Sequence, residues 1–167
     1  MRIWFDTEFV DTGALIIPLS IGMVREDGEE LYAEFAQAWH ARTQQIASSW
    51  VWKHVYPHLT GPGLSYVEIR ERVLDFAGRD PEFWAYYADY DWVLLCQLFG
   101  PMVDLPAHWP KFCLDLKQEA DMFGCSQFEG FRLPKQTGIE HHALHDARWT
   151  REAHLWLESM MRKERGL

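Results

Sequence analysis

The sequence predicts an α/β domain with a mixed β-sheet, and the order of its segments is the main evidence. Bulky apolar segments typical of strands come first, and segments with helical spacing then alternate with further short apolar segments. A chain of 167 residues that are 48% hydrophobic can bury a substantial core. We therefore expect a single α/β domain over residues 1–167.

The expected strands are short, bulky and apolar. They are residues 2–6, 15–24, 30–35, 82–88 and 112–114. The letters EDG at residues 26–28 form a turn signal that joins the second strand to the third. The fourth strand is rich in aromatic residues, which favour strands.

The expected helices show apolar residues at helical spacing between turn signals. They are residues 41–56, 65–77, 91–99, a segment ending at Gly124, and 143–161. The first ends before Pro57. Ser65 and Glu68 have the spacing of a capping box at the start of the second. The last is the most regular of the chain, with Ala143, Ala147, Thr150, Leu157 and Met161 on one face.

Charge and cysteine content limit the possible function. A net charge of -9 counts against a broad surface for duplex nucleic acid, which needs clustered Lys and Arg. Bound divalent cations could still supply positive charge at a phosphate. Cys96, Cys113 and Cys125 lack CxxC spacing, so we expect no zinc site and no disulfide. No apolar run is long enough to cross a bilayer, and we expect a cytoplasmic protein with no membrane partner.

Two carboxylates follow the first strand in Asp6-Thr7-Glu8. Side chains two residues apart on a strand point to the same face. Two such carboxylates are costly beside an apolar strand unless a cation compensates them, and magnesium or manganese suits oxygen ligands. A solvated strand end is the alternative.

Asp91 is expected at the end of the fourth strand, just before a helix. It could cap that helix, contribute to a metal site where strand and helix ends meet, or do both. Asp89, two residues earlier, is the rival candidate.

The segment HHALHDA at residues 141–147 is the richest in potential catalytic groups. His142 and Asp146 are four residues apart and would share a helix face. His141 is five residues from Asp146, so it could reach Asp146 only if it folds back from the loop before the helix. Spacing alone therefore favours His142 as the partner of Asp146. Both histidines could also lie at the start of a helix without a catalytic role.

Together, DTE at residues 6–8, YD at 90–91 and HHALHDA at 141–147 resemble the three motifs of the DEDDh 3′-5′ exonucleases. The resemblance spans nearly the whole chain, because the order and spacing of the motifs agree. DTEF and WAYYADYDWVLLCQLFGPM at 84–102 are similar to a small bacterial subgroup of polyadenylate-preferring exoribonucleases. The resemblance implies a ribonuclease H-like fold, with a central mixed sheet flanked by helices.

The resemblance also implies a site and an activity. It assigns the binding of two Mg²⁺ ions, with Mn²⁺ as a substitute, to Asp6, Glu8, Asp91 and Asp146. It makes His141, rather than His142, the general base. The implied reaction is 3′-5′ hydrolysis of single-stranded RNA or 3′ overhangs to nucleoside 5′-monophosphates, with a preference for adenylate, and a homodimer is compatible with it. Phe9 and Val10 after DTE, and YAD where an Asn usually stands, depart from the pattern and leave the substrate contacts open.

Aromatic side chains are candidates for gripping a single strand, because bases stack on them. Phe9, Trp50 and Trp52 are candidates to stack on terminal bases, although most of the nine Trp must lie in the core. Lys135 and Arg132 could contact phosphates or belong to a solvated loop.

Three rival functions remain on the sequence alone. A DNA exonuclease would carry the same motifs. A catalytically idle nucleic-acid-binding module on the same fold would have no reason to keep the costly acidic cluster. A metal-dependent hydrolase of small nucleotides fits the acidic charge.

Overall fold

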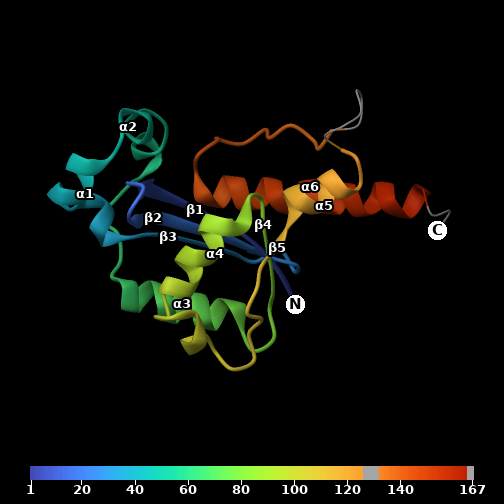
Figure 1. Ribbon diagram of the computed structural model, residues 1–167, viewed down its shortest axis with the longest axis horizontal. Coiled ribbons are helices and arrows are strands. Elements are labelled where there is room, and N and C mark those ends of the chain that lie inside the picture. The colour runs from blue at the N-terminus through green and yellow to red at the C-terminus, as the bar shows by residue number, and fades with distance from the viewer. Residues whose placement is uncertain (126–131, 165–167) are drawn as a thin grey trace.

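The computed structural model describes residues 1–125 and 132–164, and its centre is a five-stranded sheet (Figure 1). The strands are β1 (Arg2–Asp11), β2 (Ile16–Arg25), β3 (Glu30–Glu34), β4 (Glu82–Ala85) and β5 (Leu114–Asp115), in the order β3-β2-β1-β4-β5. β1 pairs antiparallel with β2 and parallel with β4. The predicted α/β class with a mixed sheet is therefore confirmed.

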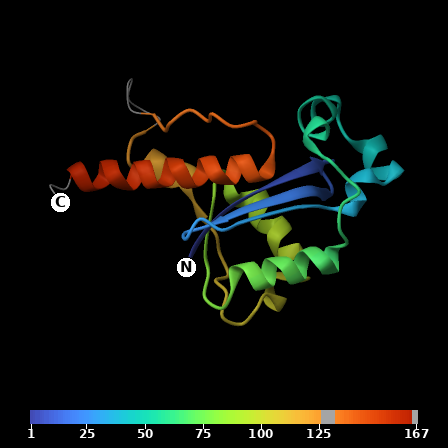
Figure 2. The same ribbon diagram turned by 180° about the vertical axis from the view of Figure 1, so that it is seen from behind.

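Helices cover both faces of the sheet (Figures 1 and 2). The long α6 (Ala143–Glu164) lies along one face with α5 (Leu116–Met122) beside it. The other face carries α3 (Tyr66–Ala77) and α4 (Ala88–Gln97). The short α1 (Ala41–Ile46) and α2 (Ser49–His54) lie beyond one end of the sheet.

Alternation along β1 divides its side chains between two cores, because successive strand residues point to opposite faces. Ile3 and Phe5 pack into the core with α3 and α4. Trp4 packs into the core with α5 and α6. Because the alternation continues along β1, Asp6 and Glu8 face α6, whereas Thr7 faces α4.

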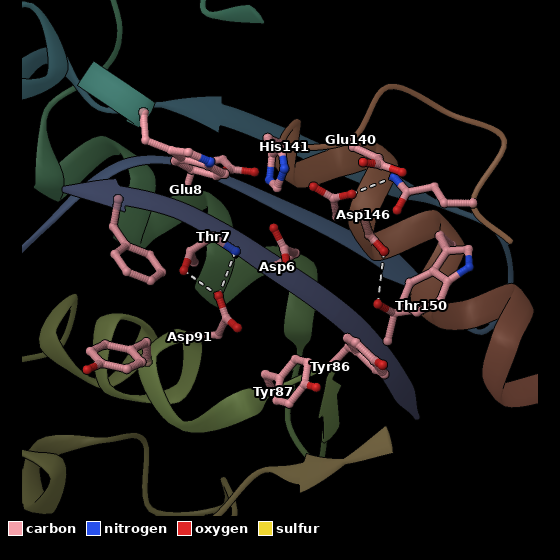
Figure 3. Close-up of a pocket in the computed structure, with 15 residues that line it drawn as sticks. Asp6, Thr7, Glu8, Tyr86, Tyr87, Asp91, Glu140, His141, Asp146 and Thr150 are labelled. Carbon is pink, nitrogen blue, oxygen red and sulfur yellow. Dashed lines mark hydrogen bonds between the residues drawn. The ribbon is translucent and has the colours of Figure 1, made fainter. Parts of the chain in front are cut away.

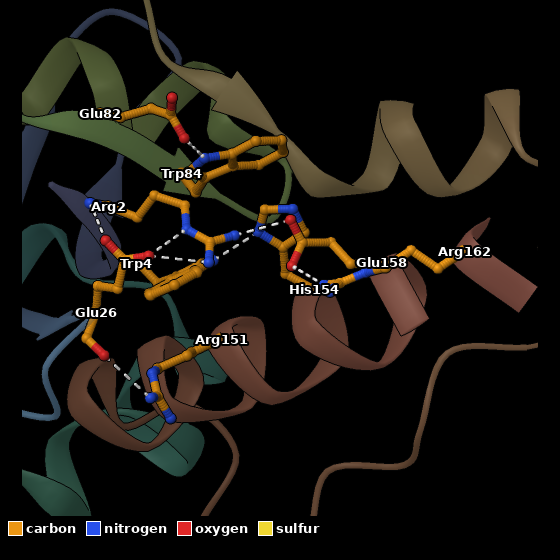
Figure 4. A network of polar contacts seen from close by, with 9 residues as sticks. All are labelled: Arg2, Trp4, Glu26, Glu82, Trp84, Arg151, His154, Glu158 and Arg162. Carbon is orange, nitrogen blue, oxygen red and sulfur yellow. Dashed lines mark hydrogen bonds and ion pairs between the residues drawn. The ribbon is translucent and has the colours of Figure 1, made fainter. Parts of the chain in front are cut away.

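Polar contacts fasten the start of β1 to α6 (Figure 4). The Trp4 indole Nε1 donates to His154 Nδ1 at 2.9 Å, and Arg2 pairs with Glu158 at 2.8 Å. His154 is only 2% exposed, and its burial lowers its pKa. The strand that carries the first acidic motif is thus fixed against the helix that carries the last.

Several predicted boundaries were wrong. β1 continues to Asp11, so Asp6 and Glu8 lie within a strand and not after it. The single helix expected at 41–56 is two helices, because Ser48 caps a new helix by accepting a hydrogen bond from Val51 N at 3.2 Å. The last strand lies at 114–115 and not 112–114.

The structure also corrects the segment around Asp91. β4 ends at Ala85, because the Tyr87 backbone is left-handed (φ 61°) and α4 begins at Ala88. Asp91 therefore lies in the first turn of α4, not at a strand end, and Tyr87 occupies the N-cap position instead of Asp91.

The capping box is a local prediction that the structure confirms. The capping box of Ser65 and Glu68 is present at the start of α3. The three cysteines are free thiols, two of them buried. Within residues 1–125 and 132–164, no helix is long and apolar enough to span a membrane.

Candidate metal centre and active site

Three carboxylates converge where β1 meets the start of α6 (Figure 3). Asp6, Glu8 and Asp146 each offer a carboxylate oxygen, and these oxygens lie within 4.8 Å of one another. Asp6 and Glu8 come from the α6 face of β1, and Asp146 from the first turn of α6. Hard divalent cations prefer such a cluster of oxygen ligands.

Gly22 allows α6 to approach the sheet this closely. It is the β2 partner of Asp6, so it stands beside the carboxylate cluster. A Cβ at Gly22 would lie 2.2 Å from the backbone nitrogen of Leu144 in α6. Any side chain at this position would therefore push the helix and Asp146 away from Asp6.

Hydrogen bonds hold both carboxylate oxygens of Asp146. The backbone N–H of His142 donates to Oδ2 at 3.1 Å. The Gln136 side-chain amide donates to Oδ1. These donors fix the carboxylate at the helix start, so its orientation is set before any ion binds.

Asp91 reaches the same cleft from α4. Its Oδ1 accepts hydrogen bonds from the backbone N–H of Thr7, at 2.8 Å, and from the Thr7 hydroxyl. The pairing of β1 with β4 ends at Trp4, which leaves the edge of β1 at Thr7 free to bind this carboxylate. Asp91 is 5% exposed and lines the cleft together with the other three acids.

Burial and mutual repulsion make Asp6, Glu8 and Asp91 hard to ionise in the absence of a cation. Burial, and then the charges of Asp91, Glu8 and Asp146, raise the pKa of Asp6 well above its usual range. Burial and the neighbouring Asp146 raise the pKa of Glu8 to about 9. Burial raises the pKa of Asp91 to about 7, although its hydrogen bonds from Thr7 act in the opposite direction. A divalent cation would reverse these shifts.

The cleft around the acids has a volume of about 450 Å³ and mainly acidic and aromatic walls. Its aromatic lining consists of Phe9, Trp50, Tyr86, Tyr87, Tyr90 and Trp149. In the parts of the chain that the structure describes, no Lys or Arg lines it. The site thus offers surfaces for bases and ligands for cations, but no protein cation for a phosphate.

The two candidate histidines point to different places. His141 lies before α6 with φ 62°, and this left-handed backbone turns its ring into the cleft, where it meets Trp50 edge-on at 4.6 Å between ring centroids. His142 stacks on Tyr32 at 4.6 Å, outside the cleft lining, and burial lowers its pKa. The loop before α6 therefore folds back so that the His141 ring, and not the His142 ring, lies beside the acids. Asp89 is exposed and outside the cleft lining.

The structure separates the expected substrate-binding residues. Phe9 and Trp50 line the cleft, and Phe9 stacks on Tyr90 with 5.4 Å between ring centroids. Trp52 instead stacks on Tyr56 at 4.1 Å and is not part of the lining. Arg132 and Lys135 line an adjoining cavity and not the cleft itself.

Sequence reasoning missed several lining residues. Gln136 and Glu140 belong to the segment 125–140, which has no periodicity that could indicate which side chains face the site. Tyr86 and Tyr87 were assigned to a strand, whereas they form the turn between β4 and α4. The only sequence signal for them was their proximity to the YD motif.

Comparisons with known proteins agree with this geometry. Residues 1–157 match the model of the 3′-5′ exoribonuclease Rv2179c-like domain family. The proteins named 3′-5′ exoribonuclease Rv2179c and 3′-5′ exoribonuclease MT2234.1, from two strains of Mycobacterium tuberculosis, are each 39% identical over 156 residues, which cover 89% of this chain and 88% of theirs.

Solved structures of exonuclease I share the fold. One has a TM-score of 0.65 at 16% identity and covers 89% of this chain. The zinc-bound complex of the E. coli enzyme with single-stranded DNA has a TM-score of 0.61 at 16% identity and covers 98% of this chain. The chain spans 39% and 40% of the length of these two proteins. The ribonuclease H-like fold that the motifs implied is thereby confirmed.

The family match, the identity to the mycobacterial proteins and the shared exonuclease fold lead to one conclusion: this chain belongs to the family of 3′-5′ exoribonuclease Rv2179c-like domains.

Proposed function

We propose that this protein is a metal-dependent 3′-5′ exoribonuclease. It hydrolyses single-stranded RNA or 3′ overhangs to nucleoside 5′-monophosphates and prefers adenylate tracts. Family membership and the exonuclease fold support nuclease activity. The observation that carries the metal-dependent mechanism is the convergence of Asp6, Glu8 and Asp146 within 4.8 Å in a cleft that has room for a nucleotide.

The carboxylates fit two divalent cations, Mg²⁺ with Mn²⁺ as a substitute. Asp6, Glu8 and Asp146 would hold them, with Asp91 completing the ligand set from the opposite wall. When bound, the ions supply the positive charge that stabilises the attacking and leaving oxygens of an in-line displacement at phosphorus. The raised pKa values of Asp6, Glu8 and Asp91 support this assignment, because the buried acids lack a compensating charge.

His141 is the general base in this proposal. It is the histidine of the HHALHDA motif that lines the cleft, so its ring is placed to take a proton from the attacking water. Trp50 and His54 flank the ring, with centroids 4.6 and 6.0 Å away, and limit its movement. After the bond breaks, the upstream strand keeps a 3′-hydroxyl and the terminal nucleotide leaves with the phosphate.

A 5′-labelled single-stranded RNA and its DNA equivalent test the proposal directly. The expected result is a ladder that shortens from the 3′ end with Mg²⁺ or Mn²⁺, disappears with chelator, and forms faster on RNA. An oligoadenylate should be shortened faster than an oligouridylate of the same length. Equal rates on DNA would contradict the RNA assignment, and no cleavage with either ion would favour the idle binding module.

A further inference from the structure

A second cavity adjoins the catalytic cleft. It has a volume of about 480 Å³ and shares Tyr86, Gln136, Glu140 and Trp149 with the cleft. Its charge differs from that of the cleft, because three cations, Lys117, Arg132 and Lys135, line it together with the carboxylates of Asp121 and Glu140. Lys117 pairs with Asp121, but neither Arg132 nor Lys135 makes an ion pair within residues 1–125 and 132–164. In a chain with a net charge of -9, two unpaired cations beside an acidic site suggest an anionic ligand.

Tyr87 lines the catalytic cleft next to Tyr86, which lines both cavities. Its ring lines the catalytic cleft, meets Tyr86 edge-on at 4.8 Å, and lies 5.9 Å from the Lys117 ammonium. The side chain is 62% exposed, so the core does not require it. A large aromatic surface is therefore available to a ligand that passes from one cavity to the other.

The backbone of Tyr87 is strained. With φ 61°, it occupies the left-handed region, which is unfavourable for a bulky residue with a Cβ. In the described chain, the only other non-glycine residue with positive φ is His141, which lines the same cleft. Such strain persists when the surroundings require it, and it concentrates at functional sites. Glycine would adopt this left-handed backbone with less conformational strain. A role for the aromatic ring therefore explains why tyrosine occupies this position.

The chemistry of the strand decides which part of the substrate could use the cation-lined cavity. A 3′-terminal nucleotide carries the scissile phosphate and, beyond its sugar, only a hydroxyl. All further phosphates of the substrate lie on the other side of the scissile bond, one for each nucleotide. A second site for phosphate next to the metal centre can therefore serve only the upstream strand.

From these observations we infer that the upstream strand leaves the metal centre across Tyr87 into the cation-lined cavity. The base of the penultimate nucleotide stacks on the Tyr87 ring, and the next phosphate lies near Arg132 and Lys135. This inference rests on the proposed nuclease function and names the path of its substrate. It makes Tyr87 a substrate-binding residue whose strained backbone is maintained for binding.

Two substrates separate this role from catalysis. One is a pentaadenylate, which has an upstream strand. The other is the p-nitrophenyl ester of adenosine 5′-monophosphate, in which nitrophenol replaces that strand. Tyr87→Gly and Tyr87→Ala should each lower kcat/KM for the pentamer roughly 10- to 100-fold, the usual effect of losing a base stack. Hydrolysis of the ester should fall less than hydrolysis of the pentamer in both variants, because the ester has no upstream base to stack on Tyr87.

The same two variants test the strain. Both remove the ring, but only glycine relieves the left-handed backbone. The melting temperature of Tyr87→Gly should exceed that of Tyr87→Ala by about 2–4 °C, while their activities agree. A glycine variant less stable than the alanine variant would contradict the inference.

The cavity is tested with the double variant Arg132→Gln/Lys135→Gln. It should lose activity selectively on the pentamer and show a weaker salt dependence than the wild type. Phe112→Ala is the matched control for the ring, because Phe112 is 61% exposed and precedes β5, at the opposite end of the parallel strands from Tyr87. Arg70→Gln/Arg72→Gln, on the exposed side of α3, controls for the loss of two charges.

The outcomes distinguish this inference from the proposed function. Wild-type protein that hydrolyses the ester with Mg²⁺ has a working metal centre. If the Tyr87 and cation variants then lose activity equally on ester and pentamer, or on neither, the path is wrong although the function stands. If the wild type cleaves neither substrate, the proposed function itself is wrong, and this path is wrong with it.

Discussion

Asp6, Glu8 and Asp146 are held close together although each would be more stable apart when ionised. We expect Asp6→Asn and Asp146→Asn to reduce nuclease activity by more than the roughly 100- to 10,000-fold effect typical of losing a general base. In the proposed mechanism, both ions depend on this cluster. Because Asp6→Asn removes a charge from a buried and repulsive group, this metal-free variant should melt at or above the wild-type temperature at pH 8.

Melting curves with and without Mg²⁺ check this prediction alongside the nuclease assay. The matched control is Asp89→Asn, which removes a carboxylate that is exposed outside the cleft. Variants of Asp6 or Asp146 that turn over at a near-wild-type rate would exclude these residues as ligands.

His141 and His142 provide a second test at the level of single residues. His141→Ala should fold and bind metal normally but hydrolyse RNA roughly 100- to 10,000-fold more slowly, because the cleft loses its proton acceptor. His142→Ala removes a ring that stacks on Tyr32, so it should mainly lower stability. Single-turnover rates and thermal melting of both variants measure these effects, and a slower chemical step in His142→Ala would reverse the assignment.

At the level of elements, the distance between β2 and α6 controls the site. Gly22→Ala introduces a methyl group where the Leu144 backbone already lies, and such overpacking typically costs about 1–3 kcal/mol. Because the displaced helix carries Asp146, the variant should also require more Mg²⁺ for half-maximal activity.

A Mg²⁺ titration of activity at a temperature well below melting checks the Gly22 prediction. Gly22 does not have a positive φ, so the methyl group causes only a steric effect. Unchanged Mg²⁺ dependence together with lower stability would show that the helix adjusts without moving Asp146.

The elements also show what the sequence can reveal. Helix α6 and the capping box of α3 were predictable, because their signals lie within a few neighbouring residues. The break between α1 and α2 and the end of β4 were not, since they depend on a cap at Ser48 and a left-handed residue at Tyr87. Local propensity does not indicate when tertiary contacts will impose an unfavourable backbone.

For the candidate site, the sequence predicted the acidic residues but not all of the residues that surround them. Motif order singled out Asp6, Glu8, Asp91 and Asp146, and all four line one cleft. Gln136 could not be found in the same way, because its hydrogen bond to Asp146 is made by an irregular loop. Trp52 shows the opposite error, since an exposed tryptophan near the site stacks on Tyr56 and not in the cleft.

For the whole molecule, metal binding should be coupled to pH. The pKa values of Glu8, about 9, and Asp91, about 7, lie above their unfolded values, so the native state binds more protons between about pH 4 and pH 9. These acids therefore make the metal-free protein less stable as pH rises through that range. Mg²⁺ displaces the protons, so the increase in melting temperature that it causes should be larger at pH 8.5 than at pH 5.5.

Melting temperatures measured with and without Mg²⁺ at each pH isolate this effect. His154 has a lowered pKa and contributes stability that is lost as pH falls below about 6.5, but its contribution is the same in both samples. Glu8→Gln should reduce the dependence on pH. An increase in melting temperature that does not vary with pH would show that the acids are ionised before the ion binds.

The cluster formed by Asp6, Glu8 and Asp146 joins the first strand to a helix that follows more than a hundred residues later in the sequence. During synthesis, a ribosome makes Asp6 and Glu8 early and Asp146 late. The cluster of three carboxylates therefore cannot assemble until the segment containing Asp146 has emerged from the ribosome.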